Sequence, residues 1–198
     1  MADPIVTEQA AKPTAPLQLA IVRQRYTPYG GAERFVSDAM QALQQVGVKL
    51  SLYTREWPGG DSIFQPVICN PFYLGSLWRD WSFGRAVCKA IGIHQPDLVQ
   101  SHERIRCCDI FRAGDGLHRV WLAERRRHLS WLGKLSITLN PTHHFRLAVE
   151  NRLFASPRLK AVICILEMIR DEMLSHFPID LVKLYVIYNV VDTSGFCL

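Results

Sequence analysis

The sequence lacks the cysteine arrangements that bind metals or carry out dithiol redox chemistry. Its six cysteines form no CxxC pair, and no Cys–His cluster has the spacing of a zinc site. The sequence therefore supports neither a metal site nor a thioredoxin-like site, and free thiols in a reducing cytosol are expected. The adjacent pair Cys107-Cys108 carries no motif of a nucleophilic cysteine, so we interpret it as packing.

Long apolar runs are absent as well. No segment approaches the roughly 18 uninterrupted apolar residues of a membrane-spanning helix. Residues 1–16 (MADPIVTEQAAKPTAP) contain acids and three prolines and have no apolar run of signal-peptide length. We expect them to form a disordered leader, because they bury too little apolar surface to offset their ordering entropy. A cytoplasmic protein is predicted.

The composition is that of a globular protein. The chain has 198 residues, of which 48% are hydrophobic, enough to fill the core of one domain. Its formal charge of +5 favours an anionic partner: phosphate, nucleotide, membrane surface or nucleic acid. Nucleic acid is the weakest of these, because no helix-turn-helix, zinc-finger or RNA-recognition motif accompanies the charge.

Strand and helix patterns alternate along the chain. Residues 17–23 (LQLAIVR) read as a buried strand, apolar residues then recur at helical spacing over 32–46, and Gly47 precedes a second strand at 48–54. This is a βαβ unit, and the alternation predicts an α/β fold with a single Rossmann-like, doubly wound parallel sheet. Further strands are expected at 66–68, 98–101, 109–113, 160–164 and 184–188, and further helices at 72–91, 117–128, 142–155 and 166–176.

The stretch RYTPYGGAER places Gly30 and Gly31 in the turn after the first strand. In an open α/β sheet this turn lies at the ligand-binding edge, and glycines let the backbone approach a phosphate at the start of a helix. A tight strand-to-helix turn is the alternative explanation. The motif is not GxGxxG, which argues against an ordinary nicotinamide or flavin site.

The run IVRQRYTPYGGAERFVSDAMQALQQVGVKLSLYTREW resembles the opening of family 4 glycosyltransferases, and DIFRAGDG and VIYNVVDT continue the likeness over 17–193. That family has two Rossmann-like domains in the GT-B arrangement, of which this chain would be the N-terminal, acceptor-side half. Within the family the chain is most similar to enzymes of lipopolysaccharide core assembly. The resemblance implies retaining transfer from a nucleotide sugar to a lipid-linked glycan acceptor, with no metal or other cofactor.

The resemblance also implies roles for individual residues. Gly30 and Gly31 would border the donor phosphates, and Glu33 and Arg34 would follow in the first helical turn, either at the cleft or as an exposed pair. Asp115 matches an aspartate that lies beside the donor and acceptor sugars in core-assembly enzymes. There it would bind the attacking hydroxyl or orient the transferred sugar, although an aspartate before GLHRVWLAERRR also suits a helix N-cap.

Two further polar residues directly follow the strand expected at 98–101. His102 and Glu103 face the ligand edge of the predicted sheet, and we take them as candidate cleft residues. A merely polar surface pair is the alternative.

A basic segment extends from residue 116 to residue 146. It holds six Lys or Arg residues against the single acid Glu124, with tryptophans and leucines interleaved. This pattern suits an anionic membrane surface on the inner face of the cytoplasmic membrane, or a phosphorylated acceptor. A solvated helix face with its tryptophans in the core is the alternative. The candidate residues of this patch are Arg119, Arg125, Arg126, Arg127 and Trp131.

The motifs of the family's donor-binding domain are missing from this sequence. Relatives carry two glutamates with seven residues between them, and no two glutamates here are so spaced. We expect a domain at 17–193 followed by an aberrant tail at 194–198, and a chain that transfers sugar weakly or not at all alone. The alternatives are a non-catalytic acceptor- or membrane-binding module, paired or not with a separate donor domain, and a nucleotide-binding domain unrelated to sugars.

Overall fold

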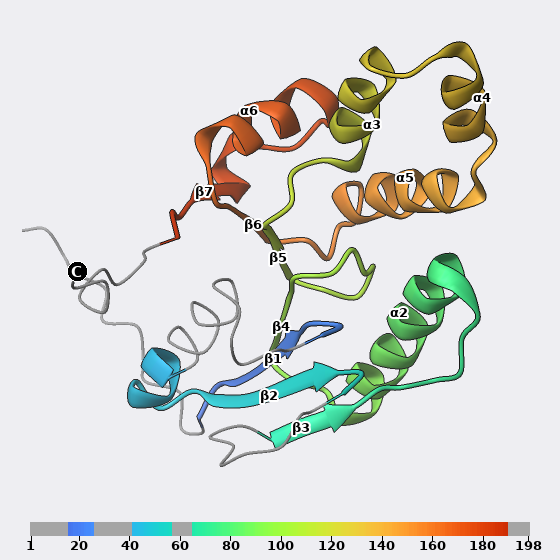
Figure 1. Ribbon diagram of the computed structural model, residues 1–198. Coiled ribbons are helices and arrows are strands. Elements are labelled where there is room, and N and C mark those ends of the chain that lie inside the picture. Colours follow the sequence, from blue (N-terminus) through green and yellow to red (C-terminus); the bar gives the residue numbers. More distant parts are fainter. Residues whose placement is uncertain (1–15, 26–40, 57–64, 190–198) are drawn as a thin grey trace, which may run out of the picture.

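The computed structural model describes residues 16–25, 41–56 and 65–189, which form a seven-stranded parallel sheet with helices packed against it (Figure 1). The strand order is β3-β2-β1-β4-β5-β6-β7, as in Rossmann-like domains. The strands are β1 (Gln18–Val22), β2 (Lys49–Thr54), β3 (Gln65–Ile68), β4 (Leu98–Ser101), β5 (Ile110–Ala113), β6 (Ala161–Cys164) and β7 (Leu184–Val186).

Helices follow the strands along the chain. They are α2 (Gly75–His94), α3 (His118–Arg127), α4 (Trp131–Leu139), α5 (Pro141–Phe154), α6 (Glu167–His176) and the short 3₁₀ helix η1 (Leu181–Lys183). Residues 41–45 are also helical and lead through Gly47 into β2. Gly47 has a φ of 83° and donates its N–H to Gln44, so it ends that helix as its sequence position predicts.

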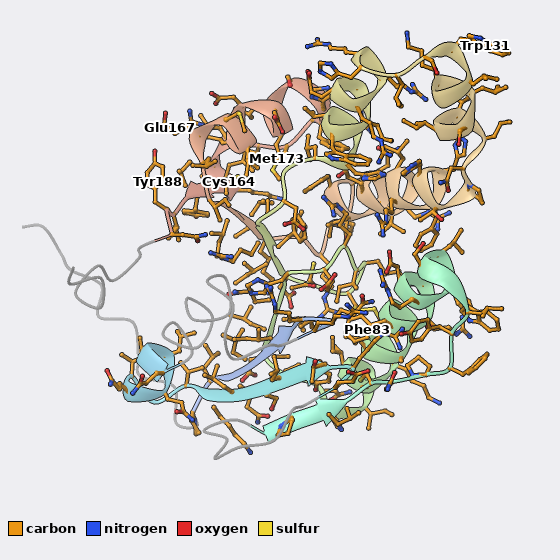
Figure 2. All side chains as sticks on the ribbon, in the orientation of Figure 1. Phe83, Trp131, Cys164, Glu167, Met173 and Tyr188 are labelled. Carbon is orange, nitrogen blue, oxygen red and sulfur yellow. A yellow bond between two sulfur atoms is a disulfide. The ribbon has the colours of Figure 1, made fainter. Side chains whose placement is uncertain are left out.

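The sheet is apolar on both faces, as a parallel sheet requires. On one face, Val99, Phe111 and Val162 pack in the same cluster as residues of three helices. These are Phe83 of α2 (labelled in Figure 2), Leu153 of α5 and Met173 of α6. On the opposite face, Leu19, Ile21, Leu50 and Leu52 pack with Leu43.

The fold confirms the predicted class and most of its elements, with two differences. The helix expected at 72–91 begins at Gly75, where the glycine has a φ of 76°, and ends at His94, before a left-handed Gln95 and Pro96. Helix α4 was not expected, since Trp131–Leu139 is nine residues long, contains Gly133 and is too short to show a clear period.

Two cysteines contradict the expectation of free thiols. Cys88 of α2 and Cys107 of the β4–β5 loop form a disulfide. They are 19 residues apart, and only the folded topology brings the helix beside that loop. Cys69, Cys108 and Cys164 are free and buried, so packing is the role of Cys108 but not of Cys107. Cys197 lies outside the described residues.

Candidate functional site: a cleft at the carboxyl ends of the strands

A cleft of about 260 Å³ opens where the parallel strands end. Its polar lining comes from the segments after β1, β4 and β5, including Arg23, His102 and Asp115. Strands β1 and β4 are neighbours, and the direction in which the chain adds strands reverses between them. This reversal is the switch point at which open α/β sheets bind ligands.

The cleft brings together three of the predicted site residues. His102 and Glu103 follow β4 directly, and Asp115 follows β5, so topology places all three in one lining. The other cleft candidates, Gly30 with Gly31 and Glu33 with Arg34, lie outside the described residues.

Glu103 is half-buried between the ends of β1 and β4. Its Oε1 accepts a hydrogen bond of 2.9 Å from the backbone N–H of Gln24. The Ser101 hydroxyl fixes the same turn, because its Oγ donates to the carbonyl of Glu103 at 2.6 Å and accepts from the Glu103 N–H at 3.0 Å. Burial raises the pKa of Glu103, while the Gln24 N–H and Arg23 act in the opposite direction.

His102 supplies a neutral imidazole to the cleft. Burial and the nearby charges of Arg112 and Arg23 lower its pKa to about 3. Its backbone N–H donates to the carbonyl of Val22 at 3.0 Å, so the residue is tied to β1. At neutral pH the ring is therefore suited to hydrogen bonding rather than to acting as a cation.

Asp115 is exposed at the mouth of the cleft, and the N-cap alternative for it is wrong. Helix α3 begins at His118, with Leu117 in the N-cap position and no side chain capping it. The N–H of His118 instead donates to Glu150 Oε1 at 2.8 Å. Among the described residues, the Asp115 carboxylate has no hydrogen bond or ion pair, so it is available to a ligand.

Glu150 of α5 organises this site, although it is not among the residues predicted from the sequence. Its side chain is fully buried, and its Oε1 also accepts from Arg104 Nε at 3.2 Å, while Arg119 Nε lies 3.9 Å from Oε2. Arg104 in turn donates to the carbonyl of Gly116 at 2.7 Å. In the sequence, Glu150 follows Leu147 by three residues and precedes Phe154 by four. A helix therefore places this acid on the same face as two apolar residues, which is the signal that could have identified it.

The cleft is basic overall. The arginines in its lining are Arg23, Arg25, Arg104 and Arg112, and its acids are Glu103 and Asp115. Such a lining attracts polar, anionic ligands. Within the described ranges, no group of three or more His, Cys, Asp or Glu side chains could hold a metal ion.

The predicted basic patch lies on α3 and α4, away from the sheet (Figure 2). Arg125, Arg126 and Arg127 occupy the last turn of α3, and Trp131 is 72% exposed. Arg119, the fifth residue of the predicted patch, instead contacts the protein: its guanidinium lies over the Phe177 ring and donates a hydrogen bond to Asn151. The alternative that puts the tryptophans in the core is wrong, because Trp121 is also 46% exposed.

The fold defines a Rossmann-like domain, and its cleft lies at the switch point where such sheets bind ligands. The family model for Glycosyltransferase Family 4 matches residues 29–194, and the chain belongs to this family. No curated protein matches the sequence.

In the part of the chain that the structure describes, no helix has the length and hydrophobicity needed to cross a bilayer.

Solved glycosyltransferase structures share this Rossmann-like fold, as half of the GT-B arrangement would. WaaG, a glycosyltransferase involved in lipopolysaccharide biosynthesis, is 16% identical with a TM-score of 0.73, covering 85% of this chain and 44% of that one. A glycosyltransferase from Rickettsia africae ESF-5 is 13% identical with a TM-score of 0.52, covering 91% of this chain and 45% of that one. The chain thus spans less than half the length of either structure.

The depressed histidine pKa values predict acid sensitivity. The pKa of His102 is about 3 and that of His118 is about 4, whereas the ordinary pKa of a histidine is 6.5. Below pH 6.5, these two histidines therefore bind protons in the unfolded chain but not in the folded chain. The free energy of unfolding should therefore fall on acidification from pH 7 to pH 4, by at most about 1.4 kcal/mol per pH unit for each histidine. The raised pKa of Glu103 opposes this trend at the acid end.

Urea unfolding at several pH values measures this slope. We expect His102→Gln to reduce the slope, because the buried ring that resists protonation is removed. A His102 imidazole that titrates by NMR with a midpoint near 6.5 contradicts the prediction.

Proposed function

We propose that this chain is the acceptor-side domain of a retaining glycosyltransferase that acts on a lipopolysaccharide core or a related glycan. The observation that carries the proposal is the cleft at the switch point, where Asp115 stands unpaired beside a basic lining. Membership of glycosyltransferase family 4 supports sugar transfer, and the likeness to WaaG favours a core-type acceptor.

The reaction needs a hydroxyl nucleophile, an activated sugar and a stabilised leaving group. The acceptor oxygen bonds to the anomeric carbon, on the face from which the diphosphate leaves. The carbon–oxygen bond to the diphosphate breaks with its electron pair, and the hydroxyl proton passes to the diphosphate. Cationic side chains such as Arg23 and Arg112 would stabilise the charge that develops on the leaving group.

The cleft residues have separate tasks in this scheme. Asp115 accepts a hydrogen bond from the attacking hydroxyl or from the transferred sugar, and the neutral His102 ring hydrogen-bonds a sugar hydroxyl. In the GT-B arrangement the donor binds between two domains, so the second domain supplies further partners for the diphosphate. Residues 17–193 form the acceptor-side domain in this proposal.

Changing Asp115 to asparagine tests the proposal. We expect Asp115→Asn to weaken binding of a deacylated lipopolysaccharide core oligosaccharide by about 10- to 100-fold, because a charge-assisted hydrogen bond is lost. Isothermal titration calorimetry on the 198-residue chain measures the affinity. Mass spectrometry of the same mixtures, supplemented with UDP-glucose, measures transfer, which we expect to be slow with this chain alone.

The matched control is Asp171→Asn, an exposed carboxylate that pairs with Arg170 on α6. It should bind the oligosaccharide as wild type does. If Asp115→Asn binds as tightly as wild type, or if no core oligosaccharide binds at all, the proposed acceptor site is wrong.

We also propose that the α3–α4 surface contacts an anionic membrane on the cytoplasmic side. Three observations support this: Leu132 and Leu139 are 60% and 69% exposed on α4, Trp131 of the same helix is also exposed, and three arginines end the preceding helix. Apolar side chains and adjacent guanidinium groups suit a lipid headgroup region. Such a contact would hold the enzyme near a lipid-linked acceptor.

Vesicle flotation tests this surface. Replacing Arg125, Arg126 and Arg127 by glutamine should weaken binding to phosphatidylglycerol vesicles by about 100-fold, at roughly 1 kcal/mol for each arginine. Lys49, Lys89 and Lys183 lie on other elements, and their replacement by glutamine removes the same charge as a control. Equal loss in both triple variants, or no binding by wild type, contradicts the proposal.

A further inference from the structure

A groove between α2 and α5 continues from the cleft. The groove has a volume of about 160 Å³ and is joined to the cleft by an intermediate hollow of about 200 Å³. Arg104 lines all three spaces, Glu103 and Asp115 line the cleft and the hollow, and Asp80 lines the hollow and the groove. A ligand long enough to occupy the groove therefore has a path to Asp115.

Arginines from three elements converge on this α2–α5 groove. Arg85 comes from α2, Arg152 from α5 and Arg106 from the β4–β5 loop, and all three are exposed. The guanidinium groups of Arg106 and Arg152 have no hydrogen bond or ion pair with any described residue. Unpaired guanidinium groups at a concave surface attract phosphate or carboxylate groups, which they bind with two parallel hydrogen bonds.

The single acid in the groove lining is already neutralised. Asp80 binds Arg146 of α5 at 2.9 Å and Arg79 at 3.2 Å, so it also joins α2 to α5 at the boundary of the groove and the hollow. Its charge therefore does little to offset the arginines. The Cys88–Cys107 disulfide fixes the loop that carries Arg106 against α2. The positive groove is consequently held in place before any ligand binds.

The groove also presents flat apolar surface. Trp81 is 48% exposed, and the Arg85 guanidinium lies 5.9 Å from the centre of the Trp81 ring. Phe145 and Val149 of the facing helix α5 also line the groove. Gly84 also lines the groove, and a Cβ at this position would lie 3.5 Å from the Ile105 side chain. Indole rings offer a rigid apolar face next to a polar edge, which matches the alternating surface of a sugar ring.

We propose that the α2–α5 groove binds an anionic saccharide chain, whose phosphate or carboxylate groups pair with Arg85, Arg106 and Arg152 while its end reaches Asp115. This inference rests on the proposed function and extends it from the reacting sugar to the charged sugars behind it. The groove is distinct from the α3–α4 surface, because it is hollowed and lies between two other helices. Its concave shape fits one chain of sugars rather than a flat bilayer.

Titration calorimetry with two soluble probes tests this site. We expect the chain to bind mannopentaose phosphate more tightly than neutral mannopentaose, with an affinity that falls as salt is added. The double variant Arg106→Gln/Arg152→Gln should bind the phosphorylated probe about tenfold or more weakly. Its affinity for the neutral probe should be unchanged.

The control is Lys49→Gln/Lys89→Gln, which removes the same charge at exposed positions outside the groove. Equal affinity for both probes, or equal loss in the control, overturns the proposal. Vesicle flotation of the same double variant tests whether the groove holds a lipid headgroup instead. If Arg106→Gln/Arg152→Gln abolishes binding to vesicles but not to mannopentaose phosphate, the groove holds a lipid headgroup and the proposal is wrong. Circular dichroism confirms that each variant folds.

These outcomes separate the groove from the proposed function. Calorimetry with mannopentaose phosphate needs no donor and no turnover, so it supports or overturns the groove even if no sugar is transferred. Conversely, Asp115→Asn reports on the acceptor end while leaving the arginines of the groove in place.

Discussion

The polar architecture of the cleft depends on one buried carboxylate. Glu150 is fully buried on α5, yet it binds the first N–H of α3 and the guanidinium of Arg104. Arg104 carries this connection onward to the carbonyl of Gly116, next to Asp115. Removing one partner from such a buried network typically costs about 3–5 kcal/mol, so these segments are strongly held. Asp115 stands two residues before the N-cap position of α3 and is left unpaired.

This constraint links the cleft to the α2–α5 groove. Arg104 belongs to the Glu150 network and lines the cleft, the intermediate hollow and the α2–α5 groove. The loop that carries Arg104 and Arg106 is held at one end by the Ser101 and Glu103 turn and at the other by the disulfide at Cys107. A saccharide lying along the groove would therefore meet groups whose positions are already fixed, which lowers the entropy cost of binding.

Much of the fold could be predicted because parallel strands buried on both faces are short apolar runs. Strand β4 was predicted at its observed bounds, and β1 and β6 within one residue at each end. Parallel topology then placed His102, Glu103 and Asp115 at one edge. The resemblance to family 4 enzymes indicated Asp115, whereas strand order alone would not have distinguished it from its neighbours.

What could not be predicted depends on contacts between distant segments. The Cys88–Cys107 disulfide and the role of Glu150 arise only when α2, α5 and the β4–β5 loop are brought together. The same holds for the α2–α5 groove, since its arginines come from three elements and form no pattern along the chain. The N-cap alternative for Asp115 failed because a side chain from another helix supplies the acceptor.

Photo-cross-linking tests whether the cleft at the strand ends binds the acceptor glycan. A deacylated core oligosaccharide that carries a diazirine is irradiated with the protein, and the modified peptides are mapped by mass spectrometry. We expect labels in the segments 102–104 and 114–116, which line the cleft. Labels confined to other surfaces, such as α4 or α6, would contradict it.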